Sequence, residues 1–183
     1  IELSSRSGEE IRRLLRENKE IKRWEQQLSG AGAMLEESEY TGGELSARRI
    51  YNKSGLVGEE LHYEGGATTE RFVYRYRSRQ LTLVEAFDGS GASVYRESYR
   101  YAQRGLLREV AKSFPSGAVH LYLYNFGNST ISEERIIQDN AFFISRYDTK
   151  GRLVHFESWK DSKPELLKRW EYKGDSRTPS YQA

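Results

Sequence analysis

The chain has 183 residues, enough for one domain of ordinary size or a short array of repeats. Its 31% charged residues and mean hydropathy of -0.81 indicate a thin core, but 13 Tyr, 7 Phe and 3 Trp are more than a disordered segment carries. A net charge of +2 provides no overall field for nucleic acid or anionic lipid, and the lack of Cys excludes disulfides and thiol chemistry.

Residues 1–30 are predicted to form an N-terminal amphipathic α-helix. Ser7 and Glu10 fit a capping box, and apolar residues follow at helical spacing until the glycines of residues 30–32 end the helix. The helix is expected to dock on the rest of the protein, with a coiled-coil partner or a membrane-surface helix as alternatives that would allow helix-mediated association. The apolar stripe consists of Ile11, Leu14, Leu15, Ile21, Trp24 and Leu28.

From Tyr51 onward, tyrosine recurs every 23 to 25 residues, a period that indicates an array of one supersecondary unit. A short polar segment with Gly and Leu often follows the tyrosine, as in YNKSGL (51–56), YAQRGL (101–106) and YDTKGRL (147–153). About twelve residues later comes a second turn, as in YEGGA (63–67) and FPSGA (114–118). Two turns per repeat predict one β-hairpin per repeat. The periodic tyrosines are Tyr51, Tyr76, Tyr101, Tyr124, Tyr147 and Tyr172.

These motifs resemble two families of bacterial repeats. The segment YDTKGRL resembles the YD repeats of RHS-type proteins, and the period is similar to that of bacterial MORN-like repeats. The resemblance covers roughly residues 35–174. It implies hairpins laid side by side in a continuous antiparallel sheet, without an enzyme active site in the repeats.

We therefore expect a mainly β fold. About six hairpin repeats over residues 31–174 would form an extended, curved antiparallel sheet, with a closed barrel as the alternative, and residues 175–183 would form a C-terminal tail. A four-residue turn at 77–80 would place Tyr76 opposite Leu81 and Tyr74 opposite Leu83. The predicted aromatic face of this hairpin consists of Phe72, Tyr74, Tyr76, Leu81, Leu83 and Phe87.

Catalytic and metal chemistry find little support in the sequence. The three histidines His62, His120 and His155 lie in different hairpins without a ligand at a recognised metal spacing, and no G-x-S-x-G or phosphate loop occurs. Adjacent carboxylates in a strand, such as 59–60 and 133–134, point to opposite faces of the sheet. We expect no enzyme, no metal site and no cofactor.

Arginine and tyrosine alternate over several strands. A basic segment of net charge +3 at 94–118 could bind single-stranded nucleic acid, but cross-strand pairing within the sheet is the favoured interpretation, so nucleic acid is an unlikely partner. We expect a non-catalytic binding or scaffold protein whose sheet surface contacts a protein or glycan. The predicted binding residues are Tyr74, Tyr76, Tyr99, Tyr101, Tyr122, Tyr124, Arg75 and Arg100.

Two other settings stay open. The family resemblance implies, as an alternative, a component of a bacterial toxin or antitoxin conflict system. The start at Ile1 suggests a trimmed or processed product, such as a cell-envelope lipoprotein without its anchor. A periplasmic or cell-surface location is favoured over the cytoplasm, and no transmembrane segment is expected because no apolar run approaches about 20 residues.

Overall fold

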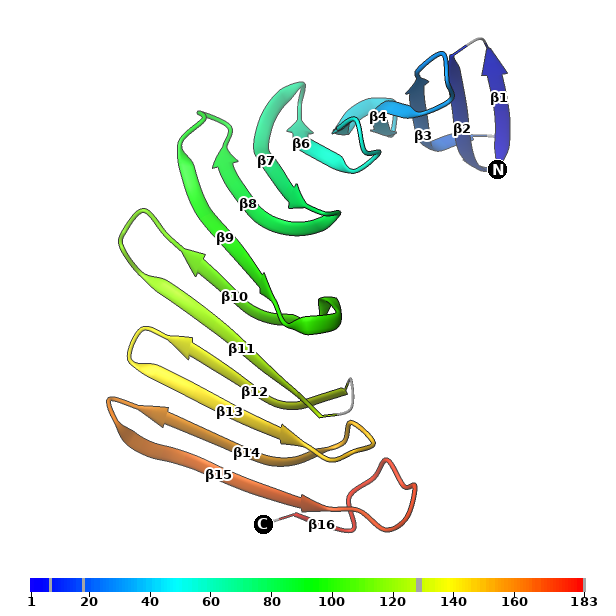
Figure 1. Ribbon diagram of the computed structural model, residues 1–183. Coiled ribbons are helices and arrows are strands. Elements are labelled where there is room, and N and C mark those ends of the chain that lie inside the picture. Colours follow the sequence, from blue (N-terminus) through cyan, green and yellow to red (C-terminus); the bar gives the residue numbers. More distant parts are fainter. Residues whose placement is uncertain (7, 18, 128–129, 183) are drawn as a thin grey trace. The chain divides into compact units, whose positions relative to one another are not determined.

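The protein is an array of antiparallel β-strands in two compact units. The computed structural model describes residues 1–6, 8–17, 19–127 and 130–182. Unit 1 comprises Ile1–Arg96 and unit 2 comprises Glu97–Ala183, and strand β9 (Ser93–Tyr101) crosses the boundary (Figure 1). Within each unit the strands lie in the sheet in the order in which they follow along the chain, without closing into a barrel in the described parts.

The bounds of the strands follow the predicted turns. In unit 1 the strands are β1 (Glu2–Arg6), β2 (Glu9–Arg16), β3 (Lys19–Leu28), β4 (Met34–Thr41), β5 (Glu44–Tyr51), β6 (Val57–Glu64), β7 (Ala67–Arg77) and β8 (Gln80–Asp88). In unit 2 the 3-10 turn η1 (Gln103–Gly105) precedes β10 (Leu107–Ser113), β11 (Val119–Gly127), β12 (Thr130–Gln138), β13 (Ala141–Tyr147), β14 (Leu153–Lys160), β15 (Lys163–Glu171) and β16 (Tyr181–Gln182). The predicted antiparallel hairpins are therefore confirmed, and β16 lies in the segment that we expected as a C-terminal tail.

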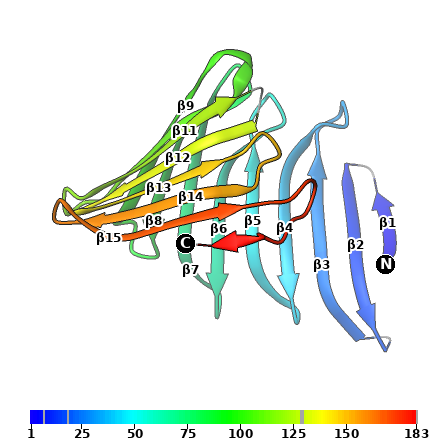
Figure 2. The same ribbon diagram turned by 90° about the horizontal axis from the view of Figure 1, so that it is seen from below.

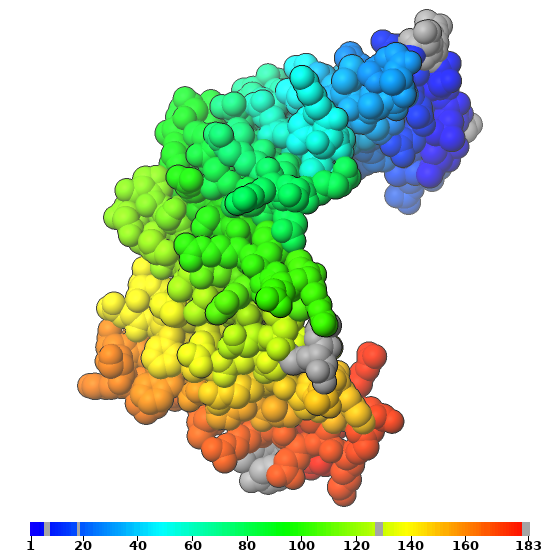
Figure 3. Space-filling model, in the orientation of Figure 1, coloured from blue at the N-terminus to red at the C-terminus, as the bar shows by residue number. Residues whose placement is uncertain are grey.

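Each unit is one layer thick. Figures 1 and 2 show no helix packed over the strands of either unit, and in Figure 3 the visible surface follows the strands in chain order. As a result few side chains are fully enclosed, and none of the described large ones falls below 2% exposure. The most buried residues are Ala47, Val84, Ala86, Gln26 and Ser158. The thin core predicted from composition is thus the consequence of a sheet without a second layer.

The predicted N-terminal helix is wrong. Residues 9–28 form the antiparallel strands β2 and β3, in which Arg12 lies opposite Trp24 and Leu14 opposite Lys22. Gly8 and Glu17 have positive φ angles of 80° and 53°, which a helix interior does not accept. Ser7, the expected cap, and Asn18 lie outside the described residues. The described part of the chain contains no helix long and apolar enough to cross a membrane.

The physical reason is that strand pairing outweighs helical periodicity here. Both segments contain apolar residues that fit a helical stripe, but they also fit two strands that add to the existing sheet. The segment Ser29–Ala33 is a five-residue loop of the kind that recurs at Asn52–Leu56, not the end of a helix. Its sequence, SGAGA, is similar to the later turn FPSGA and was the signal that the array of strands begins before residue 31.

One kind of connection between strands is a five-residue loop with a recurring pattern of hydrogen bonds. In the loop after Tyr51, the Asn52 N–H donates to the Leu56 carbonyl (2.8 Å) and the Gly55 N–H donates to the Asn52 carbonyl (2.9 Å). The side chain of Asn52 also accepts from the Ser54 and Leu56 amides, and Gly55 has a φ of 72° that favours glycine. The same backbone bonds occur in the loops that begin at Ser29, Asp88, Phe114 and Asp148.

The other connection is a two-residue turn followed by a β-bulge. At Ser78 and Arg79 both φ angles are positive, and Tyr76 lies opposite Leu81 as predicted. Beyond that pair a bulge shifts the register, so that Tyr74 lies opposite Val84 rather than Leu83. Because a shift of one residue moves side chains to the other face, the predicted face is wrong at two of its members. Leu83 and Phe87 lie opposite Arg75 and Arg71 on the other face, while Val84 and Ala86 join Phe72 and Tyr74.

A hydroxyl residue marks these bulges. In four of them the extra residue is Ser or Thr, and its hydroxyl donates to the carbonyl of the residue seven positions earlier on the partner strand. The bond stabilises the irregular part of the ladder, where one residue has no direct partner. These bonds are Ser46 to Glu39 (3.0 Å), Thr69 to His62 (3.3 Å), Thr82 to Arg75 (3.0 Å) and Ser132 to Asn125 (3.1 Å).

Candidate functional site

In unit 1 the predicted tyrosines Tyr74 and Tyr76 lie on the same face of β7. The hydroxyl of Tyr74 donates to Glu60 on β6 at 2.9 Å. Partial burial, together with the hydrogen bond and the charge of Glu60, raises the pKa of Tyr74, and burial raises that of Tyr76. Both rings are half-buried among their neighbours, so their first role is to hold adjacent strands together.

In unit 2 the predicted tyrosines Tyr99, Tyr101, Tyr122 and Tyr124 are also half-buried and share one face. Tyr99 donates to Glu97 (2.6 Å), which pairs with Lys112 (3.1 Å), and the register places Lys112 on the face of Tyr122 and Tyr124. Burial raises the pKa of Tyr101, and burial together with the charge of Glu134 raises that of Tyr124. This tyrosine face therefore exists in each unit, although its rings are only partly accessible.

The predicted arginines lie on the opposite face from the tyrosines. Arg75 alternates with Tyr74 and Tyr76 along β7 and pairs with Glu85 (3.2 Å), while Arg100 pairs with Glu109 (3.3 Å). The structure therefore does not bring the predicted tyrosines and arginines together on one surface. Side chains alternate between the two faces along a strand, so the sequence alone already places each arginine on the face opposite to the tyrosines beside it.

Two cations of the basic segment at 94–118 are balanced locally by carboxylates. Arg100 and Lys112 both have acidic partners, and they lie on different faces of the sheet. Arg108 differs, because within the described residues its side chain has neither a hydrogen bond nor an ion pair. A single continuous basic surface, as binding to a nucleic-acid strand requires, is not formed by these three residues.

Unit 1 is held by a ladder of charges that the sequence analysis did not identify. Arg49 on β5 lies between three glutamates, at 3.0 Å from Glu37, 3.6 Å from Glu39 and 2.9 Å from Glu60. Gln26, only 4% exposed, donates to Glu37 at 2.5 Å. The glutamates are 13 to 17% exposed, so the ladder is shielded enough to matter for stability.

Two of these glutamates titrate at lower pH than usual. The hydrogen bond and charge of Lys22, 2.6 Å away, lower the pKa of Glu39. Partial burial opposes the shift at Glu60, but the hydrogen bond from Tyr74 and the charge of Arg49 outweigh it and lower the pKa of Glu60. Both carboxylates therefore stay ionised to a lower pH than an ordinary glutamate does.

The two adjacent carboxylate pairs behave as the alternation of side chains predicts. Glu59 pairs with Arg71 on one face, while Glu60 contacts Arg49 and Tyr74 on the other. In unit 2, Glu133 binds Arg135 and Arg146, both at 2.8 Å, while its neighbour Glu134 accepts a hydrogen bond from Tyr147 on the opposite face. None of these pairs forms a shared acid and base site.

Unit 2 carries a continuous row of apolar side chains on the face opposite its tyrosines. Cross-strand partners follow one another directly through six strands, so their side chains are neighbours on one face. At a strand spacing of about 4.8 Å, five spacings span about 24 Å. We call this set the apolar row, and it consists of Ala111, Leu121, Ile137, Phe142, Trp159 and Pro164.

The rows beside it become more polar step by step. Next to the apolar row, apolar and charged residues alternate from Glu109 through Leu123 to Leu167. Beyond that lies a polar row that begins at Asn125 and ends at Arg169. Ile137 is 39% exposed and Leu167 is 53% exposed, so part of this surface is accessible to a partner.

The apolar row was not predicted from the sequence, because the periodic tyrosines mark the other face of the sheet. The available signal was the pair of adjacent apolar residues in two strands, Ile136–Ile137 and Phe142–Phe143. Neighbouring residues in a strand face opposite sides, so each doublet supplies one side chain to each face. In the row, Phe142 stacks on Trp159 with ring centroids 5.4 Å apart and planes 12° from parallel.

The three histidines lie apart, each with its own neighbours. His62 lies between Glu60 (3.3 Å) and Glu70 (3.1 Å), His120 contacts the ring of Phe114, and His155 is 3.8 Å from Glu157. Within the described ranges, no group of three or more His, Cys, Asp or Glu side chains is arranged to hold a metal ion. The carboxylates near the histidines therefore form ion pairs within the sheet.

Comparison with known proteins adds no identification to these observations. No protein-family model matches the chain, and a search of curated proteins finds no similar sequence, so the resemblance to YD and MORN-like repeats stays a prediction.

Proposed function

We propose that the protein is a non-catalytic binding module and that the apolar row of unit 2 contacts a protein partner. The observation that supports this is the continuity of the row through six strands of unit 2, whose described residues form a single layer. A standard protein interface covers about 800 Å² on each partner, or about 28 Å across, and the row spans about 24 Å. The row therefore supplies the length of such an interface, and the two rows beside it on the same face would have to supply its width.

The arrangement of polarity also favours a protein. Interfaces commonly have an apolar centre and a polar rim, and here the apolar row passes into a mixed row and then a charged row. The matching partner has apolar side chains opposite Ile137 and Trp159 and ionic side chains opposite Glu133 and Arg146. A glycan is less suitable, because sugars bind to open aromatic faces and the two aromatic rings of the row stack on each other.

The other settings that the sequence suggested remain predictions. These settings are a role in a bacterial conflict system and a place in the cell envelope. The tyrosine face also stays a predicted surface, although its partial burial favours a structural role.

The test uses the intact chain as bait in an extract of the source cell. The double variant Ile137→Ser with Leu167→Ser removes accessible apolar area in and beside the apolar row. The matched control, Leu14→Ser with Ile21→Ser, removes two exposed apolar side chains from unit 1. We expect one protein whose capture falls at least tenfold with the first variant and is unchanged with the control.

Folding is checked by circular dichroism of all three proteins, because the comparison requires intact sheets. If every captured protein is retained equally by the two double variants, the apolar row is not the binding surface and the proposal is wrong.

A further inference from the structure

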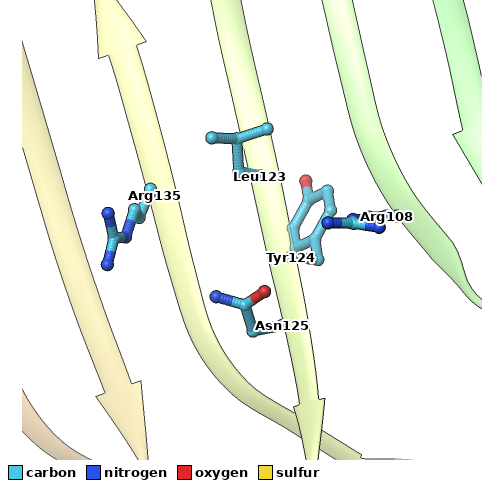
Figure 4. A pocket seen from close by; sticks show the side chains of 5 residues that line it. All are labelled: Arg108, Leu123, Tyr124, Asn125 and Arg135. Atoms are coloured by element: carbon cyan, nitrogen blue, oxygen red, sulfur yellow. The ribbon is translucent and has the colours of Figure 1, made fainter. Parts of the chain in front are cut away.

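Strands β10 and β11 stop pairing before they end. Their register runs from Ser113 with Val119 to Glu109 with Leu123, and no described pair continues it toward η1. Figure 4 shows the side chains around this point: Arg108 on β10 lies beside the ring of Tyr124 on β11, Asn125 follows Tyr124 on β11, and Arg135 lies on β12. The sheet is hollowed where the ladder ends.

Two hollows adjoin there. The first has a volume of about 220 Å³ and is lined by Arg108, Leu123, Tyr124, Asn125 and Arg135. The second is more open, measures about 480 Å³ and shares three of these residues. Its further lining residues are Ala102, Gln103, Leu106 and Phe126. Sites for small molecules and anchoring side chains have volumes of this order, beginning near 300 Å³.

The lining combines a cation with apolar walls. Arg108 has no carboxylate partner in the described part of the chain, whereas Arg135 is held by Glu133 at 2.8 Å. Leucine and aromatic side chains form much of the remaining wall, and the amide of Gln103 adds hydrogen-bonding groups, whereas the Asn125 amide donates to Glu133 at 3.2 Å. A guanidinium in such a place binds a carboxylate through two parallel hydrogen bonds.

We propose that this hollow binds a carboxylate attached to an apolar body, with the carboxylate on Arg108 and the apolar part against Tyr124 and Leu106. One charge suits the site better than two. Glu133 and Glu134 lie close to Arg135 and Tyr124, so a doubly charged phosphate meets repulsion that a single carboxylate meets less. The site does not depend on the proposed function, because the apolar row does not include Arg108.

The carboxylate could belong to a free small molecule or to an acidic side chain of a peptide, and two probe pairs separate these sources. The free acid is N-acetylphenylalanine, with N-acetylphenylalanine amide as its neutral match. The peptide is acetyl-Phe-Glu amide, with acetyl-Phe-Gln amide as its match. Binding is followed by the amide NMR shifts of residues around 108 and 124 in the intact, isotope-labelled chain.

Arg108→Gln is the informative variant, because the side chain is exposed and has no described bond whose loss would unfold the sheet. Arg77→Gln is its control, since Arg77 is likewise exposed and without a described partner but lies in unit 1. We expect saturable shifts with at least one carboxylate probe, an affinity at least tenfold weaker in Arg108→Gln, and no change in Arg77→Gln.

The neutral probes should bind at least tenfold more weakly than their acids. Binding by only one of the two acids identifies the source of the carboxylate and supports the site. The proposal is overturned if neither acid gives saturable shifts, if the neutral probes or inorganic phosphate bind as tightly, or if Arg108→Gln retains the wild-type affinity.

Discussion

Removing Arg49 should destabilise unit 1 more than removing an exposed arginine does. Arg49 is 28% exposed and contacts Glu37, Glu39 and Glu60, so its replacement by glutamine leaves three partly buried carboxylates close together. Exposed ion pairs contribute up to about 1 kcal/mol, while removal of one partner of a buried pair costs about 3 to 5 kcal/mol. For this intermediate burial we expect a loss of about 2 kcal/mol at pH 7.

The matched control is Arg75→Gln, because Arg75 is 65% exposed and has a single partner, Glu85. Its loss should cost less than about 0.5 kcal/mol. Native-state hydrogen exchange of the amides in β4 to β7 is the suitable measurement, since it reports local opening even where unfolding is not two-state. Urea unfolding followed by circular dichroism provides a second value.

The dependence on pH gives a further check on the reasoning. Folded-state pKa values below the unfolded ones mean that Glu39 and Glu60 stabilise the protein above about pH 4.3 and lose this contribution as pH falls through their folded values. Protonated carboxylates no longer need Arg49, so the difference between Arg49→Gln and wild type should shrink toward pH 3. Equal effects of Arg49→Gln and Arg75→Gln at pH 7, or a difference that grows in acid, would refute the reasoning.

Three other outcomes are expected. A Cβ at Gly89 would lie 2.4 Å from the Thr68 carbonyl oxygen, so Gly89→Ala should lower the free energy of unfolding in urea by more than about 1 kcal/mol. The control Gly30→Ala, whose Cβ would have nothing within 4 Å, should lower it by less than about 0.5 kcal/mol. Equal losses in the two variants would contradict this expectation. Thr82→Val should remove the bulge bond to Arg75 and cost about 0.5 to 1 kcal/mol, while Thr149→Val in an exposed loop leaves the urea midpoint unchanged; no difference would show that the hydroxyl is dispensable. The wild-type protein should become less stable as the pH drops below about 4.3, because the pKa values of Glu39, Glu60 and Glu133 are lowered in the folded state. A urea midpoint that is constant from pH 7 to pH 3 would be inconsistent with these ion pairs.

The turns were predictable from the sequence because their chemistry is local. Glycine after a short polar segment, as at Gly55 and Gly151, supplies the positive φ that the five-residue loop requires. The same reasoning placed Tyr76 opposite Leu81. The register farther along the hairpin depends on a bulge at Thr82, and counting residues outward from the turn does not reveal that bulge.

The N-terminal strands and the surfaces were harder to predict. Residues such as Ile11 and Trp24 satisfy a helical stripe and a strand equally well, and only the neighbouring strands decide between them. The ladder around Arg49 joins residues from β3 to β6, so it depends on the relative register of several hairpins. The apolar row depends on five such registers in succession, and the hollow at Arg108 on where one of them ends.

Because the strands pair in the order of the sequence, the chain can fold locally and can gain or lose repeats. Among the registers described, the widest pairs, Lys22 with Thr41 and Ala141 with Lys160, join residues only 19 positions apart. Such low contact order favours fast folding, since little chain entropy is lost before each contact forms. A new hairpin can pair as soon as it is synthesised, and tandem duplication or deletion of one repeat leaves the remaining ladders unchanged.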